Sequence, residues 1–147
     1  MAIQWFITSL FPLTLILGAL LGGFYTAFSL VIFPALTAAK DSDASDFMVK
    51  VNKYAERAPF LSLFFLGLLS SIGYLGQAIT HGATVQCIGA ALVLGGGLLT
   101  ICVNVPLNRA LDQQKISWKH YRDRWIRANT LRAITSLAGV ILLLTDA

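Results

Sequence analysis

The sequence predicts an all-α integral membrane protein, a bundle of four transmembrane helices with amphipathic helical extensions on its cytoplasmic side. The first observation is composition: mean hydropathy is +0.73, 56% of the 147 residues are hydrophobic, and 12% are charged. This charged fraction is about half that of soluble proteins, so a water-soluble surface is excluded. The second observation is segregation, because no Asp, Glu, Lys or Arg occurs in residues 1–39 or 58–108. We expect a single domain over residues 1–147.

Three of the four predicted spans follow directly from uncharged runs, at residues 12–33, 59–79 and 84–104. Each run has about the 20 residues that a helix needs to cross roughly 30 Å of hydrocarbon. Pro12 suits the first turn of the first span, and Pro34 disfavours regular helix beyond it. His81 and Gly82 form a short uncharged turn, so the second and third spans should form a helical hairpin.

The fourth span is unusual because it must include a charge. After Arg132 only 13 residues precede Asp146, which is too few to cross the membrane. We therefore expect the fourth span at residues 128–145, as the membrane-crossing part of one long helix from Ser117 to about Thr145. Ser117 is a preferred residue type for a helix N-cap.

Lysine and arginine are concentrated in two of the three loops. The first loop contains Lys40, Lys50, Lys53 and Arg57, and the last contains Arg109, Lys115, Lys119, Arg122, Arg124 and Arg127. Because basic loops remain in the cytoplasm, we expect a multi-pass protein of the plasma membrane with both basic loops cytoplasmic and both termini outside. Anionic headgroups beside these loops explain the net charge of +4. The expected partner is therefore the lipid bilayer, and nucleic-acid binding is not expected.

Both basic loops should be helical rather than flexible. In the first, Phe47, Val51, Tyr54 and Ala58 recur at helical spacing with charges between them, which is typical of an amphipathic helix at the membrane surface. In the last, five residues three or four positions apart share one helix face. They are Trp118, Tyr121, Trp125, Asn129 and Arg132. The aromatic members fit either an interfacial aromatic belt or stacking on an aromatic ligand.

Arg132 is the strongest candidate for a functional residue. It should lie roughly 20 Å from the end of its helix near Thr145, which is roughly 10 Å inside the cytoplasmic edge of the hydrocarbon. An arginine at that depth costs at least a few kcal/mol unless a partner satisfies it. Two interpretations are open. Arg132 either snorkels to headgroups or pairs with Glu56, carbonyls and asparagines, or it is an unpaired cation that awaits an anionic or enolisable ligand.

Three asparagines should converge near this arginine. Asn104 and Asn108 lie four residues apart at the end of the third span, and Asn129 lies on the fourth helix. Their amides either join the helices, with each bond contributing on the order of 1 kcal/mol, or they bind a ligand. On the first span, Tyr25 and Ser29 form a further stripe at helical spacing, which either faces the same cavity or only packs.

Metal and cofactor chemistry are not expected. His81 and His120 are predicted on opposite sides of the membrane, and Cys87 and Cys102 are about 22 Å apart along the third helix, which is too far for a disulfide. The sequence offers no Ser-His-Asp, Cys-His or paired intramembrane carboxylate arrangement. We therefore predict neither a metal site nor a bound cofactor.

Two stretches of the chain resemble a known family. The run Asn-Val-Pro-Leu-Asn at residues 104–108 is followed by Trp118, Tyr121, Arg122, Trp125, Asn129 and Arg132. This pattern resembles the C-terminal half of the anthrone-oxygenase-like family of small four-span membrane proteins. Residues 22–36, from Gly-Gly-Phe to Phe-Pro-Ala-Leu, are similar to the first span of that family. A few members are associated with oxidation of anthrones to anthraquinones without metal or flavin, whereas most bacterial members have no assigned activity.

The resemblance implies a role for each candidate residue. Arg132 would stabilise the enolate charge, the asparagines would orient oxygens, and the two tryptophans would hold the rings. The catalytic candidates are Arg132, Asn108, Asn129 and Tyr121, and the substrate-binding candidates are Asn104, Trp118, Trp125, Tyr25 and Ser29. The general base is left open among Tyr121, His120 and Glu56.

The leading hypothesis is a membrane oxygenase that acts on a flat, lipophilic phenolic molecule, of the anthrone or quinol type, at the cytoplasmic leaflet. The alternative is a non-enzymatic membrane protein that binds a lipid or small molecule, or an accessory subunit of a membrane complex. A homo-oligomer remains open. A channel is disfavoured because four short spans with one intramembrane charge offer no continuous polar path.

Overall fold

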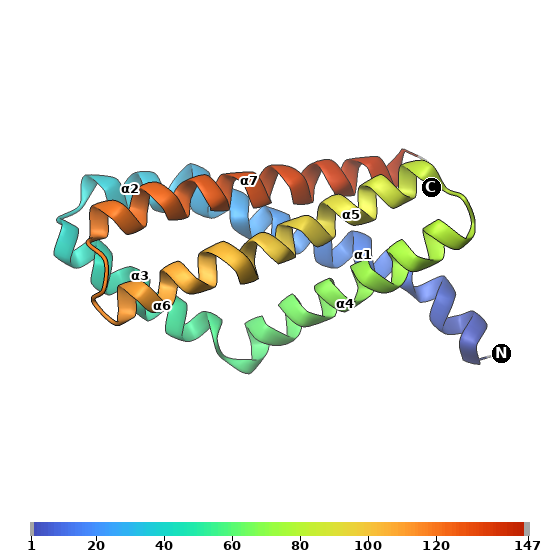
Figure 1. The fold of residues 1–147 in the computed structure, drawn as a ribbon, viewed down its shortest axis with the longest axis horizontal. Helices are drawn as coiled ribbons and strands as arrows, with labels where there is room; N and C mark the ends of the chain where they lie inside the picture. The colour runs from blue at the N-terminus through green and yellow to red at the C-terminus, as the bar shows by residue number, and fades with distance from the viewer. Residues whose placement is uncertain (1, 146–147) are drawn as a thin grey trace.

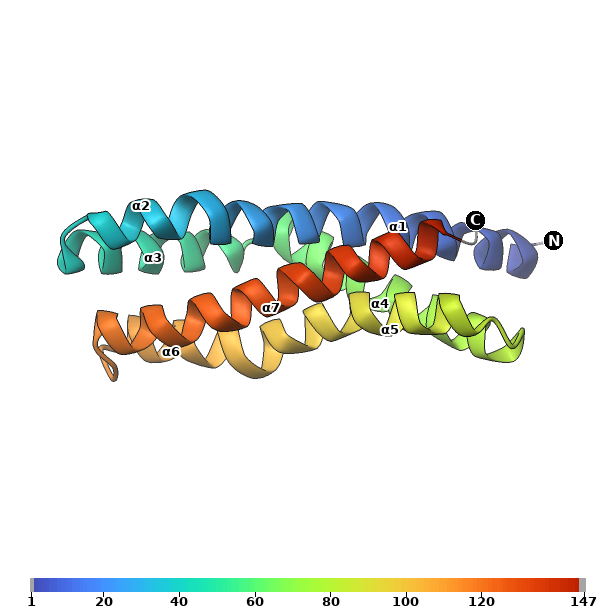
Figure 2. The same ribbon diagram turned by 90° about the horizontal axis from the view of Figure 1, so that it is seen from above.

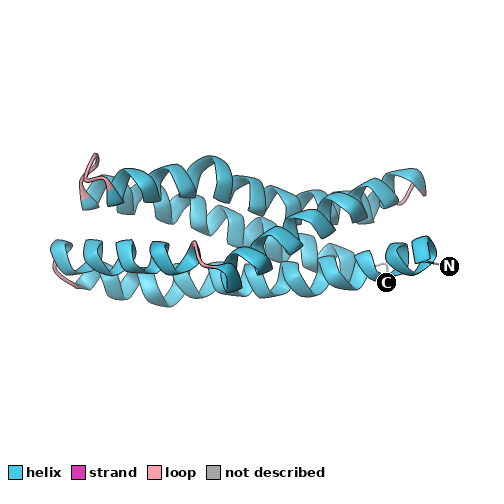
Figure 3. Cartoon of the chain, turned by 90° about the horizontal axis from the view of Figure 1, so that it is seen from below, coloured by secondary structure: helices cyan, strands magenta, loops and turns pink. Residues whose placement is uncertain are grey.

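The chain is almost entirely helical. The computed structural model describes residues 2–145, with side chains from residue 10 onward, and this range contains helices and short turns but no strand (Figure 3). Four helical stretches are long and apolar enough to cross a membrane: Leu10–Ala38, Ala58–Thr80, Thr84–Asp112 and Trp118–Leu144. The predicted all-α membrane architecture is therefore confirmed.

Within the described range, the chain is built from consecutive helical segments with few interruptions. In chain order they are α1 (Ala2–Ala27), the π-helix η1 (Phe28–Ile32), α2 (Phe33–Ala38), α3 (Asp41–Ala55), α4 (Ala58–Thr80), α5 (Thr84–Leu99), the π-helix η2 (Thr100–Asn104), α6 (Val105–Asp112) and α7 (Trp118–Leu144).

The long helices lie side by side, and the turns fall at the two ends of the bundle except for the α3–α4 turn, which lies about midway along it (Figure 1). Helix α1 begins and α7 ends at the same end, where the α4–α5 turn also lies (Figure 1). The α2–α3 and α6–α7 turns lie at the opposite end, and α3 runs back from there toward α4 (Figure 1). Seen from above, α1, η1 and α2 form one continuous rod, and α5, η2 and α6 form another (Figure 2).

The outer surface of the bundle is apolar. Large side chains such as Leu30, Leu69 and Ile141 are 72%, 62% and 61% exposed. In water such a surface would drive aggregation, whereas lipid tails are as apolar as leucine and solvate it without penalty. This surface fits a bundle surrounded by hydrocarbon.

The first and third membrane-spanning stretches are longer than the sequence predicts. Pro12 lies inside α1 rather than at its start, and Pro34 does not end the first helix. Instead, a π-helical turn precedes each of Pro34 and Pro106, with hydrogen bonds from the Phe33 N–H to the Phe28 carbonyl and from Val105 to Thr100. Proline removes an N–H and crowds the carbonyl four residues earlier. A locally wider turn accommodates the ring, so the helix continues.

Glycines allow α5 and α7 to approach closely. A Cβ atom on Gly139 would lie 2.6 Å from the carbonyl oxygen of Gly89, and one on Gly96 would collide with the Ser136 hydroxyl. Small residues serve this purpose in membrane bundles because close approach increases van der Waals contact. The helix that carries Arg132 is therefore held against the helix that carries Thr100 and Asn104.

Helix α3 is the amphipathic helix that the first basic loop predicts, although it ends at Ala55, so Ala58 belongs to α4. It buries Ala44, Met48 and Asn52 against the bundle. The predicted apolar stripe lies beside this buried face, with Phe47 and Tyr54 46% and 63% exposed. An exposed ion pair of 3.5 Å between Lys53 and Asp112 links α3 to α6.

Candidate functional site

Arg132 lies inside the protein and is held by side chains of its own and neighbouring helices. It is 5% exposed. Its Nε and Nη2 atoms donate to Asn129 Oδ1 at 3.0 and 2.7 Å, and Nη1 donates to Thr100 Oγ1 at 3.0 Å. Thr100 in turn donates its hydroxyl hydrogen to the Gly96 carbonyl. The guanidinium is therefore fixed in position rather than free to extend toward headgroups.

Two aromatic rings enclose the same guanidinium. Its Cζ atom lies 4.0 Å from the centroid of the Tyr25 ring and 5.1 Å from that of Trp125. Both distances fit cation–π attraction, which strengthens when the cation is desolvated. In the part of the chain that the structure describes, the ion pairs are Lys53–Asp112 and Arg122–Asp123, so Arg132 has no carboxylate partner.

The interpretation that Arg132 snorkels or pairs with Glu56 is therefore wrong in this structure. Glu56 is exposed at the end of α3. What remains of that interpretation is the pairing with an asparagine. A buried cation is satisfied here by neutral dipoles and π-faces, which leaves its net charge uncompensated.

Asn129 joins α7 to the first rod. Its Nδ2 atom donates to the Tyr25 carbonyl and to Ser29 Oγ, both at 2.7 Å, while its Oδ1 accepts two bonds from Arg132. Ser29 also lies 3.1 Å from Thr130 Oγ1. The amide of Asn129 is thus fully used, and it fixes the orientation of both the arginine and the first rod.

A second group of polar contacts lies further along α7, toward its N-terminus. The Asn108 Oδ1 accepts from the Tyr121 hydroxyl at 3.0 Å and from the Trp125 indole N–H at 2.9 Å. Asn104 Nδ2 lies 3.5 Å from the Trp125 carbonyl. The three asparagines therefore do not converge on one point, and Trp125 connects the two groups.

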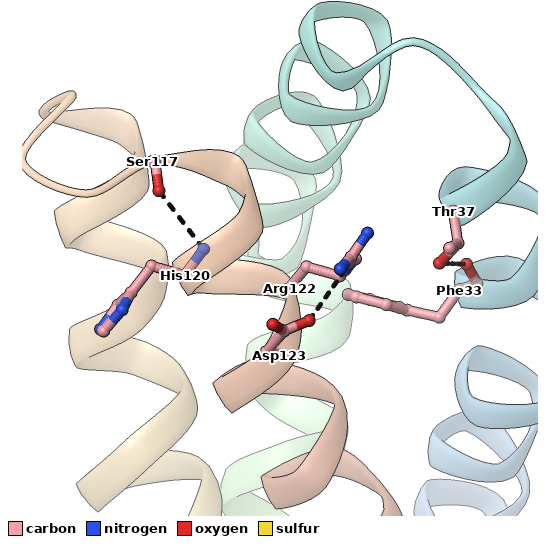
Figure 4. A network of polar contacts seen from close by, with 6 residues as sticks. All are labelled: Phe33, Thr37, Ser117, His120, Arg122 and Asp123. Carbon is pink, nitrogen blue, oxygen red and sulfur yellow. Dashed lines mark hydrogen bonds and ion pairs between the residues drawn. The ribbon is translucent and has the colours of Figure 1, made fainter.

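Aromatic rings pack around this second group. Phe33 stacks on Trp125 with centroids 4.5 Å apart and planes 8° apart, and it lies 6.2 Å from Trp118. Trp118, Tyr121 and Trp125 are all buried. The interfacial-belt interpretation is therefore wrong for these three residues. Their rings pack against the first rod inside the protein, and Figure 4 shows Phe33 extending from α2 toward α7.

Several buried polar atoms of α1, α3, η2 and α7 lack a hydrogen-bond partner. Among the described side chains these include the Tyr25 hydroxyl, Asn104 Oδ1, Asn52 Nδ2 and the Trp118 indole nitrogen. Buried polar groups are nearly always paired in native proteins, so these atoms are candidates for contact with a further polar group. Tyr25 also lines a cavity of about 10 Å³ between α1, α4, α5 and α7, which is the size of one water molecule.

Seven of the nine predicted site residues are buried, whereas Ser29 and Asn108 are partly exposed, and two of the three candidate bases lie at the surface. Tyr121 is fully buried. His120 and Glu56 are exposed, and the His120 ring points away from Phe33 in Figure 4, where the Ser117 cap and the Arg122–Asp123 pair are also drawn.

Sequence reasoning missed Thr100, Asn52 and Phe28. Thr100 lies four residues before Asn104, so the same helical spacing that linked Asn104 to Asn108 could have identified it. Asn52 and Phe28 reach the site from other helices, and nothing in their local sequence marks them. No group of three His, Cys, Asp or Glu residues in the described range is close enough to hold a metal ion.

The comparison with known families agrees with this geometry. The model of the family described as anthrone oxygenase matches residues 4–142, which include both rods, both π-helices and the whole polar cluster. No curated protein and no solved structure matches the chain. Because the match covers nearly the full length, the chain belongs to the anthrone oxygenase family.

Proposed function

We propose that this protein is a membrane oxygenase that oxidises a flat, lipophilic phenol of the anthrone or quinol type with dioxygen, without a metal or other cofactor. We further propose that it lies in the plasma membrane with its basic loops in the cytoplasm and both termini outside, so that the site faces the cytoplasmic leaflet. Family membership supports the reaction class, and the substrate and mechanism are our inference.

The observation that carries the proposal is the buried charge of Arg132. A guanidinium is protonated under all ordinary conditions, and burial of an uncompensated cation is costly. An enolate that forms beside Arg132 would supply the missing negative charge. Because this charge develops during the reaction, the preorganised cation would stabilise the transition state more than the neutral substrate.

The proposed chemistry begins with loss of a proton from the acidic C–H of the substrate. The resulting carbanion transfers electrons to dioxygen and forms a C–O bond, and loss of water from the peroxide leaves the quinone. In total, one anthrone and one dioxygen give one anthraquinone and one water. Arg132 would hold the enolate oxygen, Asn104 Oδ1 would accept a hydrogen bond from a substrate hydroxyl, and the Tyr25 hydroxyl would donate to a substrate oxygen; both atoms lack partners among the described residues. Of the three candidate bases only Tyr121 is buried, and because its hydroxyl donates to Asn108 Oδ1, it would have to act as a phenolate.

A second function is favoured by one observation. Arg132 donates its hydrogen bonds to Asn129 and Thr100 inside the protein, and the adjacent cavity has room for one water only. Such a cluster could simply join helices, as polar side chains do in membranes. The protein would then be a non-enzymatic binder of a lipid or small molecule, or an accessory subunit.

Oxygen uptake separates the two functions. The protein in lipid nanodiscs is supplied with a dihydroxyanthrone, with empty nanodiscs as the control for spontaneous oxidation. We expect Arg132→Leu to lower turnover about 10²–10³-fold while the melting temperature shows that the bundle remains folded. Arg124→Leu, at an exposed position on the same helix, should leave turnover unchanged. A folded Arg132→Leu variant with wild-type turnover would exclude the proposed role of the charge.

A further inference from the structure

An apolar groove lies at the basic end of the bundle, outside the polar cluster. It occupies about 510 Å³ between the first rod, α3 and the start of α4. Its walls are mostly aromatic, contributed by Phe24, Phe28, Phe47, Tyr54 and Phe60, with Lys50 at its edge. This volume falls in the range of about 300–1,000 Å³ that is usual for small-molecule sites.

The aromatic walls favour an aromatic ligand. The Phe24 ring lies 4.9 Å from Phe28 and 5.1 Å from Phe60, tilted by 52° and 47°, so the three rings are in contact along the groove and present both faces and edges. The Tyr54 ring, contributed by α3, is held by Arg57, whose Cζ lies 4.1 Å from the ring centroid. Aromatic surfaces gain additional energy from offset or edge-to-face contact with another ring, and a saturated acyl chain offers no such contact.

Charge at the edge of the groove favours an acidic oxygen on that ligand. Lys50 makes no ion pair with any carboxylate in the described residues, whereas Lys53 on the same helix pairs with Asp112. Arg57 adds a second positive charge beside Tyr54. A phenol that loses its proton would be attracted to this edge while its rings lie among the phenylalanines.

One wall of the groove is shared with the candidate active site. Phe28 is 4% exposed and lies 5.6 Å from Trp125 between ring centroids. Trp125 in turn lies 5.1 Å from the Arg132 guanidinium. Phe28 is also the first residue of the π-helix η1, so the ring that separates groove and cluster sits at an irregular turn of the helix.

We propose that this groove binds a planar, lipophilic aromatic molecule with an acidic hydroxyl group, taken up from the surrounding lipid, and delivers it to the Arg132 cluster past Phe28. The proposal rests on the proposed function for the chemistry at Arg132. It adds a binding site for that substrate class outside the cluster, and the route between membrane and cluster.

The test measures binding separately from turnover. A dihydroxyanthraquinone, which is the oxidised product and cannot react further, is titrated into protein-containing nanodiscs, with empty nanodiscs as the partition control. Ala55→Phe places a ring inside the groove, because Ala55 lines it, and should weaken binding tenfold or more, on the order expected when a pocket is filled. Lys50→Gln should weaken binding about fivefold. Leu66→Phe, on the lipid-facing side of α4 and 57% exposed, should change nothing.

Two results would overturn the proposal. The first is unchanged quinone affinity in Ala55→Phe, and the second is displacement of the quinone by phospholipid in the wild type with no dependence on Lys50, which would make the groove a lipid site. The outcomes for the two proposals remain distinct. Turnover that is insensitive to Ala55→Phe would exclude delivery of the substrate through the groove but not the oxygenase. Quinone binding that depends on the groove, in a protein without turnover, would exclude the oxygenase but not the groove.

Discussion

Replacement of Asn129 by aspartate tests whether the uncompensated charge of Arg132 is what the site uses. Asn129 Oδ1 already accepts bonds from Arg132 Nε and Nη2 at 3.0 and 2.7 Å. Asn129→Asp therefore places a carboxylate against the guanidinium with almost no change in shape. The cation is then neutralised internally, while the residue that carries it is untouched.

The effect on stability should be small because opposing terms roughly cancel. Two charges about 4 Å apart attract by about 4 kcal/mol at an effective dielectric constant of 20. Against this, the Tyr25 carbonyl loses its donor, at a cost of about 1–3 kcal/mol, and faces a carboxylate oxygen where the amide nitrogen lay 2.7 Å away, and the new carboxylate is buried. Ser29 can turn its hydroxyl hydrogen toward the carboxylate, so that contact survives.

The effect on activity should be large. A guanidinium that is already paired gains little from an enolate, so we expect turnover of a dihydroxyanthrone to fall about 10²–10³-fold. The measurements are oxygen uptake and melting temperature in nanodiscs. Gln113→Glu, at the exposed end of α6, adds the same charge away from the cluster and should leave both unchanged. A folded Asn129→Asp variant with turnover within about threefold of wild type would refute the reasoning.

Two further predictions concern stability, measured as the melting temperature in the same nanodiscs. Asn108→Leu should destabilise the protein by about 2–5 kcal/mol, because the Tyr121 hydroxyl and the Trp125 indole N–H both lose their acceptor. Asn108→Asp keeps an acceptor and should destabilise the protein less. Equal losses of stability in the two variants would contradict the assigned bonds. Gly139→Ala should destabilise the protein by about 1–3 kcal/mol, since its new methyl group would lie 2.6 Å from a backbone oxygen of α5. The control is Gly23→Ala, whose methyl group meets nothing within 4 Å and should leave stability unchanged. Similar melting temperatures for the two alanine variants would exclude close α5–α7 packing.

The spans, the amphipathic α3 and the long α7 could be predicted because their signals are local. Charge segregation marks the spans, and the spacing of three and four residues places Trp118, Tyr121, Trp125, Asn129 and Arg132 on one face. The Ser117 side chain caps α7 at the backbone N–H of His120, as its residue type predicts. Each of these features depends on neighbours within about one helical turn.

The environment of that helix face could not be predicted in the same way. Trp118 and Trp125 belong to an interfacial belt if nothing covers them, and to the interior if another helix does. Phe33, which covers both rings, is more than 80 residues away in the sequence. Thr100 likewise reaches Arg132 only because α5 and α7 pack closely. A single sequence does not reveal which distant residue will lie opposite a given face.

The prolines show a different limit, and they bear directly on the site. In water, proline usually ends a helix, but in lipid every backbone group must stay paired, so the rods continue through a wider turn. Each π-turn contains an extra residue, which rotates all later side chains by about 100° relative to a regular helix. Phe28 and Ser29 lie in η1, and Thr100 and Asn104 lie in η2. The contact of Phe33 with Trp125, beyond η1, and that of Asn108 with Tyr121, beyond η2, therefore depend on these irregular turns. The two prolines that interrupt regular helix position the polar cluster.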